Sequence, residues 1–274
     1  MKKLSKLRAS NKEIVIPHNA KAAATLLLRC VISVVLTLAL TIGTGLYFYN
    51  NGIIVPNDAN GYKVRGIDVS FTQGKIQWDV LAKELDFAYI KATEGSDITD
   101  PQFERNRVFS SAEDIRTGFY MYFDYDCTGE KQADFFFENV GEPEDMLPPA
   151  IYLELYKGYN DRPLPKNIVD QQLSDSISRL RAYYGISPVI FCTQRTYDLY
   201  VKNEYPDCDI WIKDVFCEPS LSDGRDWTFW QYSEKGQLPG YDGPDKYIEM
   251  DVFAGTKEEF LNYGIVNNFS DLLL

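Results

Sequence analysis

Acidic side chains close several apolar or aromatic runs of this 274-residue sequence. They are Asp68, Glu94, Asp124, Asp126, Glu154, Glu249 and Asp251. Burying a carboxylate in apolar surroundings costs free energy, so these positions suggest that a function uses the charge. Solvated loop acids are the simpler interpretation of any single one in an acidic protein, but several acids that converge on one place favour a site.

Aromatic side chains accompany these acids along the same runs. They are Tyr120, Tyr122, Tyr152, Trp211, Trp230 and Tyr232. Glycoside hydrolysis needs one carboxyl group that stays protonated and donates to the leaving oxygen, and a second group that stabilises positive charge at the anomeric carbon. Aromatic faces suit stacking against sugar rings, whereas ordinary core packing is the alternative for several of them.

Strand-like and helix-like segments alternate through most of the chain. Eight short runs rich in β-branched and aromatic residues predict strands at 64–70, 87–93, 118–124, 150–155, 188–193, 209–215, 228–233 and 247–253. Helical patterns follow the first five, at 78–85, 101–112, 130–140, 167–184 and 194–202. Repeated strand–helix units predict a parallel sheet with right-handed crossovers.

Eight strands with helical patterns after only five of them favour a closed, irregular α/β barrel. An open doubly wound sheet is the alternative, but the turn after the first strand, SFTQGKIQW, is not the Gly-rich phosphate loop typical of such sheets. In parallel barrels the chemistry collects at the C-terminal ends of the strands, where these acids lie. We therefore expect them on one rim, around an aromatic mouth.

The N-terminal part differs from the rest in charge and hydropathy. Lys and Arg outnumber acids seven to one in residues 1–29, whereas the whole chain carries a net charge of −12. Residues 30–49 are uncharged and have the length and composition of a membrane-spanning helix. The basic residues before it and the tyrosines at its end predict a single-pass anchor in the cytoplasmic membrane, with the N-terminus inside. A cleaved signal peptide is the alternative, although no A-x-A site follows.

We therefore predict five segments. They are a cytoplasmic basic segment (1–29), a transmembrane anchor (30–49), a linker (50–63), the barrel (64–262) and a C-terminal tail (263–274). So acidic a barrel is expected to repel nucleic acid. The one histidine, His18, precedes the anchor and no Cys-x-x-Cys occurs, so we expect no metal site and no cofactor. Divalent-cation binding by the acid rim is an alternative that no known loop spacing supports.

Nine motifs, in order along residues 66–255, resemble glycoside hydrolase family 25, the lysozymes that cleave between N-acetylmuramic acid and N-acetylglucosamine. They are GIDVSFTQGKIQW, FAYIKATEG, the set of Asp100, Phe103 and Asn106, GFYMYF, LPPAIYLEL, SPVIFCT, DIWIK, WTFWQYS and IEMDVFAG. Each motif is weak alone, whereas the ordered set is specific. The resemblance implies the family's irregular TIM-like (β/α)5(β)3 barrel, and peptidoglycan glycan strands as the partner.

The resemblance assigns roles to the residues that match. Asp68 matches the family's first-strand acid, Glu154 the proton-donating glutamate of its Asp-x-Glu motif, and Glu249 the acid of its last-strand segment. A proton donor must hold its proton, so apolar or like-charged neighbours are expected around Glu154. Substrate-binding residues are expected at Glu94, Tyr120, Tyr122, Asp124, Tyr152, Trp211, Gln231 and Tyr232.

The sequence departs from the family pattern at three positions. Tyr152 stands where the family has the aspartate of Asp-x-Glu, Met121 stands where histidine is frequent, and Glu249 is one methylene longer than the usual aspartate. Residues two apart in a strand face the same side, so Tyr152 and Glu154 are both expected in the mouth. A phenol titrates near pH 10 and cannot supply the missing negative charge at neutral pH.

Two hypotheses follow. The first is an active muramidase in which Glu154 donates the proton and Asp68, Asp124 or Glu249 supplies the negative charge. The second is a glycan-binding pseudoenzyme that keeps the groove and has lost the chemistry. The acids favour the first hypothesis, which we prefer, and Tyr152 and Met121 favour the second.

Overall fold

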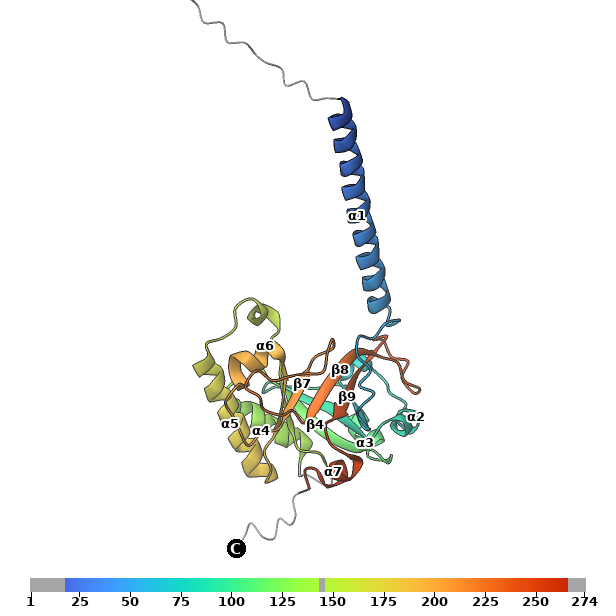
Figure 1. The fold of residues 1–274 in the computed structure, drawn as a ribbon. Coiled ribbons are helices and arrows are strands. Elements are labelled where there is room, and N and C mark those ends of the chain that lie inside the picture. Colours follow the sequence, from blue (N-terminus) through green and yellow to red (C-terminus); the bar gives the residue numbers. More distant parts are fainter. Residues whose placement is uncertain (1–17, 143–145, 266–274) are drawn as a thin grey trace, which may run out of the picture. The chain divides into compact units, whose positions relative to one another are not determined.

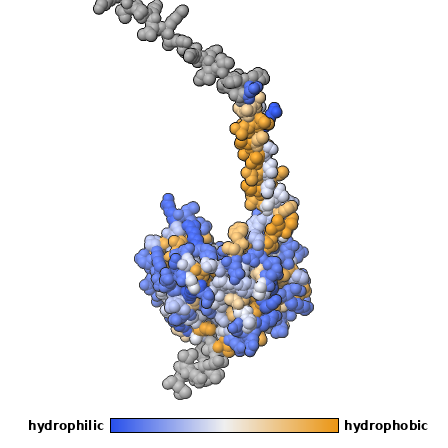
Figure 2. Space-filling model, in the orientation of Figure 1, coloured by the Kyte–Doolittle hydropathy of each residue, from blue (hydrophilic) through white to orange (hydrophobic). Residues whose placement is uncertain are grey.

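The computed structural model describes residues 18–142 and 146–265, and the chain divides into two units, one ending at Ile54 and the other beginning at Val55. In the first unit, helix α1 (His18–Asn50) contains the predicted anchor, and apolar side chains line it in Figure 2. Its segment Ala22–Asn50 contains an 18-residue stretch with a mean hydropathy of 2.3 and is long and apolar enough to cross a membrane, as a signal sequence would also be. Residues 1–17 of the predicted basic segment and 266–274 of the predicted tail lie outside the described residues.

Eight strands of the second unit close into a barrel (Figure 1). They are β1 (Val64–Val69), β2 (Phe87–Glu94), β4 (Arg116–Tyr122), β5 (Ala150–Leu153), β6 (Val189–Thr193), β7 (Ile210–Lys213), β8 (Phe229–Gly236) and β9 (Ile248–Phe253). Neighbouring strands from β1 to β8 run parallel, and β9 lies antiparallel between β8 and β1, which closes the sheet. The two-residue β3 (Ile98–Thr99) pairs with the end of β2.

Five strand–helix units precede three strands that loops connect. The helices of these units are α2 (Trp78–Leu81) with η2 (Ala82–Glu84), α3 (Phe103–Ser110), α4 (Gly129–Val140), α5 (Lys166–Tyr184), and α6 (Gln194–Thr196) with η4 (Tyr197–Val201). Three further short helices are η1 (Phe71–Gln73), η3 (Lys157–Asn160) and α7 (Lys257–Asn262). The predicted (β/α)5(β)3 architecture is confirmed, although the helix expected at 194–202 is one α-helical turn that continues into a π-helical turn.

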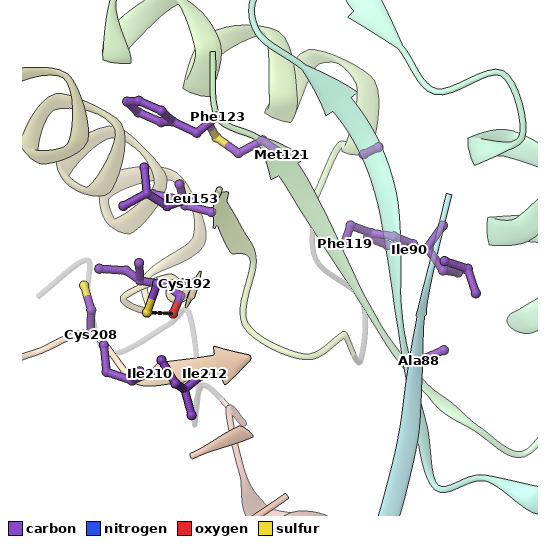
Figure 3. Close-up of a cluster of buried hydrophobic side chains, with 14 of the residues drawn as sticks. Ala88, Ile90, Phe119, Met121, Phe123, Leu153, Cys192, Cys208, Ile210 and Ile212 are labelled. Atoms are coloured by element: carbon purple, nitrogen blue, oxygen red, sulfur yellow. Dashed lines mark hydrogen bonds between the residues drawn. The ribbon is translucent and has the colours of Figure 1, made fainter. Parts of the chain in front are cut away.

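Successive strand residues alternate between two cores, because both faces of the parallel strands are buried. The inner core fills the barrel with rings such as those of Tyr89, Phe191 and Trp211. The outer core lies between strands and helices, and Figure 3 shows Met121 and Leu153 within it. Met121, which departs from the family pattern, therefore does not face the barrel interior.

Two glycines make room for aromatic rings inside the barrel. A Cβ on Gly66 would lie 2.4 Å from the ring of Phe87, and one on Gly118 would lie 2.4 Å from the ring of Tyr89. Both rings are fully buried. The rings therefore occupy the space that side chains on these inward-facing positions would fill.

A substitution at the contact between α4 and α5 tests how tightly the helices of the outer layer are packed. A Cβ on Gly129 would lie 1.7 Å from the backbone carbonyl oxygen of Gln172, so Gly129→Ala forces the two helices apart. We expect this substitution to lower the free energy of unfolding by about 1–3 kcal/mol in denaturant titrations of the full-length protein in detergent. Gly158→Ala is the control, since its methyl group meets nothing within 4 Å. Equal stability of the two variants would contradict the tight contact.

Candidate active site

A cavity of about 180 Å³ lies at the C-terminal ends of the parallel strands, where the N-terminal end of the antiparallel β9 and the turn after β1 also line it. Its lining residues are Asp68, Ser70, Phe71, Thr72, Gln73, Lys91, Tyr120, Tyr122, Tyr152, Glu154 and Glu249. The strand residues among them come from β1, β2, β4 and β9 and from the end of β5. Tyr120 and Tyr122 are two residues apart, as are Tyr152 and Glu154, which is the spacing that alternation requires of one face.

Six of the predicted site residues meet in this cavity. They are Asp68, Tyr120, Tyr122, Tyr152, Glu154 and Glu249. Gln231 is fully buried next to them, and its Nε2 donates a hydrogen bond of 2.5 Å to Oδ2 of Asp68. Gln231 therefore contacts the site through Asp68 rather than by lining the cavity.

Two predicted substrate-binding acids lie beyond the cavity lining. Glu94 pairs with the ammonium of Lys91 at 2.7 Å, and it is Lys91 that lines the cavity. The carboxylate of Asp124 accepts a hydrogen bond from the backbone N–H of Asp126, within the loop after β4. Glu94 thus reaches the cavity through its lysine, and Asp124 stabilises a turn.

Two predicted aromatic contacts also lie away from the cavity. Trp211 points inward but is fully buried deeper in the barrel, and its Nε1 donates to Oδ1 of Asp251 at 2.8 Å. Tyr232 follows the inward-facing Gln231, so it faces the outer core, where its hydroxyl accepts a hydrogen bond from Arg65 at 3.0 Å. The expectation that these two rings line the mouth is wrong, because one lies too deep and the other on the opposite face.

Three carboxyl groups on β1 and β9 form an acid cluster, of which Asp68 and Asp251 are buried and Glu249 is partly buried. The strand register sets Asp68 directly opposite Glu249. Side-chain N–H groups bind the cluster, since Gln73 donates to Glu249 at 3.0 Å and Trp211 donates to Asp251. The backbone pairing thus holds like-charged groups together in surroundings that disfavour charge.

The acid cluster holds protons at neutral pH. Burial, followed by the neighbouring Asp251, keeps the pKa of Asp68 well above its ordinary range. Burial and the charge of Asp68 raise the pKa of Glu249 to about 8. Burial also raises the pKa of Asp251 to about 8, against hydrogen bonds that favour its ionised form. Oδ2 of Asp251 is buried and has no other hydrogen-bond partner. A proton on Asp68 would allow Asp68 to donate a hydrogen bond to this oxygen.

The acids are not arranged as a metal centre. Within residues 18–142 and 146–265, no group of three or more His, Cys, Asp or Glu side chains could hold a metal ion. Amide and indole N–H groups donate to the acid cluster, and the charge of Lys213 acts on all three of its carboxyl groups.

Glu154 faces a cation. The ammonium of Lys213 lies 3.4 Å from Oε1 of Glu154 and makes a shorter ion pair with Glu234. Burial opposes the charge on Lys213, but the two carboxylates outweigh it and raise the pKa of Lys213 above its usual value. The expectation that apolar or like-charged groups surround Glu154 is therefore wrong, because one neighbour is the cation Lys213. Tyr122 and Tyr152 are uncharged neighbours that line the same cavity.

Tyr152 is packed between other rings. Its ring stacks on Phe191 with centroids 3.6 Å apart and on Tyr120 with centroids 4.9 Å apart. Burial, followed by the charges of Asp68 and Glu154, holds the pKa of Tyr152 well above its ordinary value. Tyr152 is therefore a neutral hydrogen-bonding group at physiological pH.

Sequence reasoning missed both lysines of the site. Lys91 and Lys213 each lie two residues after an inward-facing aromatic residue, Tyr89 and Trp211 respectively. Strand alternation alone places each lysine on the same face as that ring and nearer the carboxyl end. The spacing of each lysine from the preceding ring is therefore a signal that the sequence contains.

The turn after β1 also contributes residues that the sequence did not single out. Phe71 lines the cavity and is 50% exposed, and its backbone N–H donates to Oδ2 of Asp100 at 2.9 Å. Gln73 is buried and joins this turn to Glu249. Ser70 caps the turn, with its hydroxyl accepting from the N–H of Thr72. An exposed ring at the edge of a polar cavity is a surface on which a sugar can stack.

A closed (β/α)5(β)3 barrel with carboxyl groups and tyrosines around a cavity at its strand ends is the architecture of a barrel-type glycoside hydrolase. The sequence model of glycosyl hydrolases family 25 matches residues 67–241. The chain belongs to glycoside hydrolase family 25, as its ordered motifs predict.

Known proteins similar to this chain include a lysozyme. The chain is 30% identical over 208 residues to the protein YegX of Escherichia coli, covering 74% of each. It is 29% identical over 231 residues to Lysozyme M1 of Streptomyces globisporus, covering 78% of this chain and 74% of that protein. The solved structure of a family 25 glycosyl hydrolase from Bacillus anthracis has a TM-score of 0.73 and 44% identity, covering 76% of this chain and 97% of that chain. These relatives support glycoside hydrolysis of the lysozyme type.

The acid cluster links stability to pH. Its carboxyl groups bind protons in the folded state up to about pH 8, whereas their ordinary values are 4.5 for Glu249 and 3.8 for Asp251. The folded state therefore binds more protons in this window, and stability is lost as the pH rises from about 4 to about 8, by about 1.4 kcal/mol per pH unit for each proton.

This linkage is measured by denaturant unfolding at a series of pH values. We expect the free energy of unfolding to fall with rising pH between 4 and 8, and Asp251→Asn to make that fall shallower. Glu138→Gln, an exposed substitution on α4, is the control and should leave the slope unchanged. A wild-type curve that is flat over this range would contradict proton binding by the cluster.

Proposed function

We propose that the barrel domain hydrolyses the β-1,4 bond between N-acetylmuramic acid and N-acetylglucosamine in peptidoglycan. One observation carries the proposal: Glu154 opens on the same cavity as Asp68 and Glu249. A glycosidase needs two carboxyl groups in different protonation states on either side of the scissile bond. The similarity to Lysozyme M1 supports the lysozyme type of reaction.

In the proposed reaction, Glu154 donates a proton to the glycosidic oxygen as its bond to the anomeric carbon breaks. An ionised carboxylate of the acid cluster stabilises the positive charge that develops at that carbon. Water then adds to the anomeric carbon, and its proton restores Glu154. Because the cluster holds protons at neutral pH, the fraction of it that is ionised limits the charge available for this step.

A catalytically impaired, glycan-binding pseudoenzyme is the second candidate function. The neutral, buried Tyr152 favours it, since the family's aspartate would supply negative charge at that position. The same cavity, with the exposed ring of Phe71 at its edge, would then bind glycan strands without cutting them.

We also propose that the protein is anchored in the cytoplasmic membrane. The apolar segment of α1 supports a single span at residues 30–49, with the basic residues 1–29 inside. A linker at 50–63, a barrel at 64–262 and a tail at 263–274 would then lie on the outer side, where peptidoglycan is found. An uncleaved anchor predicts that the mature protein keeps its N-terminal residues.

Glu154→Gln tests the proton donor. The amide has no acidic proton to give, so we expect the rate of peptidoglycan hydrolysis to fall by about 10²- to 10⁴-fold, measured as loss of turbidity. Binding to sedimented peptidoglycan should persist, because the cavity keeps its shape. Glu138→Gln is again the control. Full activity of Glu154→Gln would refute its role, and a wild type that neither cuts nor binds peptidoglycan would refute the substrate.

Substitutions of Tyr152 separate the two candidate functions. For an active hydrolase we expect Tyr152→Phe, which keeps the ring and loses the hydroxyl, to lower kcat about tenfold, corresponding to one lost hydrogen bond of about 1.4 kcal/mol. Tyr152→Asp should not accelerate such an enzyme, because it adds a fourth carboxyl group to a cavity that three already share. An inert wild type that Tyr152→Asp makes active would establish the pseudoenzyme instead.

A further inference from the structure

Lys213 ends β7 on the inward face, and its side chain is only 20% exposed. Its ammonium lies between two carboxylates of different burial, Glu154 at 28% exposure and Glu234 at 37%. The pair with Glu234 is the shorter of the two, and Glu154, 3.4 Å from the ammonium, also lines the cavity. One cation is thus shared by the proposed proton donor and a partner outside the cavity lining.

Charged and titratable groups either line the cavity with Glu154 or reach Glu154 from outside the lining. The first set is Asp68 on β1, Lys91 on β2, Tyr120 and Tyr122 on β4, Tyr152 on β5 and Glu249 on β9, and the second is Tyr125 after β4, Lys213 on β7 and, through Lys213, Glu234 on β8. The tyrosines are neutral, since burial raises the pKa of each. Lys91 is paired with Glu94, so the cation that acts on Glu154 at ion-pair distance is Lys213.

We propose that Lys213 is a positioning residue for Glu154, whose ammonium, shared with Glu234, orients the carboxyl group and sets the pH at which it gains and loses its proton. The proposal deepens the proposed function and rests on Glu154 as the proton donor. When Glu154 is protonated, the ammonium stays with Glu234. When Glu154 has given its proton away, the ammonium pairs with the carboxylate that remains and stabilises it.

Because Glu154 and Glu234 share one ammonium, removing Lys213 and removing Glu234 should have opposite effects on the protonation of Glu154. Without the ammonium, Glu154 loses the cation that stabilises its ionised form, which favours the protonated form. Without Glu234, the whole ammonium is available to Glu154 and favours its ionised form. If Lys213 and Glu234 had only structural roles, substituting them would lower activity at every pH and leave the balance between protonated and ionised Glu154 unchanged.

The pH dependence of kcat/KM for peptidoglycan hydrolysis by the full-length protein in detergent measures this balance, since one of its limbs reports the proton donor of the free enzyme and the NMR midpoint of Glu154 identifies which limb that is. We expect Lys213→Met to move that limb to higher pH by at least about one unit, the effect of an opposite charge at this distance. Glu234→Gln is expected to move it to lower pH. Limbs that coincide with the wild type would overturn the proposal, even where activity falls.

Two further variants serve as controls. Lys213→Arg keeps a cation at the same place and should keep the limb near its wild-type position. Lys166 on α5 also lies between two carboxylates, Asp170 at 2.6 Å and Glu204 at 3.2 Å, but away from the cavity. Lys166→Met removes an equivalent bridge and should leave the pH profile unchanged. A shift with Lys166→Met as large as that with Lys213→Met would overturn the assignment to Lys213.

An NMR titration of the Glu154 carboxyl carbon, assigned with Glu154→Gln, tests the proposal without using activity. We expect its midpoint to be higher in Lys213→Met than in the wild type. A thermal melt that remains cooperative establishes that the variant is folded, and Glu234→Gln supplies the second comparison. If the wild type is inert, the proposed function fails, while a raised midpoint still supports the action of Lys213. Equal midpoints would overturn it, whether or not the protein cuts peptidoglycan.

Discussion

The antiparallel insertion of β9 between β8 and β1 is the constraint on which the site depends. It closes the barrel, and the same register places Asp68 opposite Glu249 and Gly66 opposite Asp251. Carboxylates set opposite each other in a buried sheet repel, so the arrangement is stable only if the group keeps protons and receives hydrogen bonds. The barrel cannot be closed in this register without creating a proton-holding cluster at its rim.

Two kinds of carboxyl group consequently share one cavity. The acid cluster keeps protons and receives N–H donors, with Lys213 acting on it only through its charge, whereas Glu154 lies within ion-pair distance of the ammonium of Lys213. Such differences in surroundings give carboxyl groups of one site different protonation states and therefore different roles. Tyr152 lines the same cavity as a neutral group and is stacked on Tyr120 and Phe191.

The sequence contains enough to predict the strands, the barrel and most of the cavity, because strand periodicity and strand ends are local properties. The same alternation that puts Tyr152 beside Glu154 also puts Tyr232 on the face opposite Gln231, so that error was avoidable. The depth of Trp211 depends on how the barrel closes, and no local pattern encodes it. The pairing of Lys213 with Glu234 depends on register shifts in β8 after Gln231, which only the structure supplies.

The rings of Phe87 and Tyr89, which occupy the space beside Gly66 and Gly118, also seal the barrel against water. Trp211 and Phe229 are fully buried in the same core, so its interior holds rings where a solvent channel would run. Protons therefore reach the acid cluster from solvent through the cavity itself. If the cavity binds a glycan as proposed, the bound sugar would close this route and keep the protonation state that was present when it arrived. The pH at the moment of binding would then set the protonation state of the acid cluster for each bound substrate.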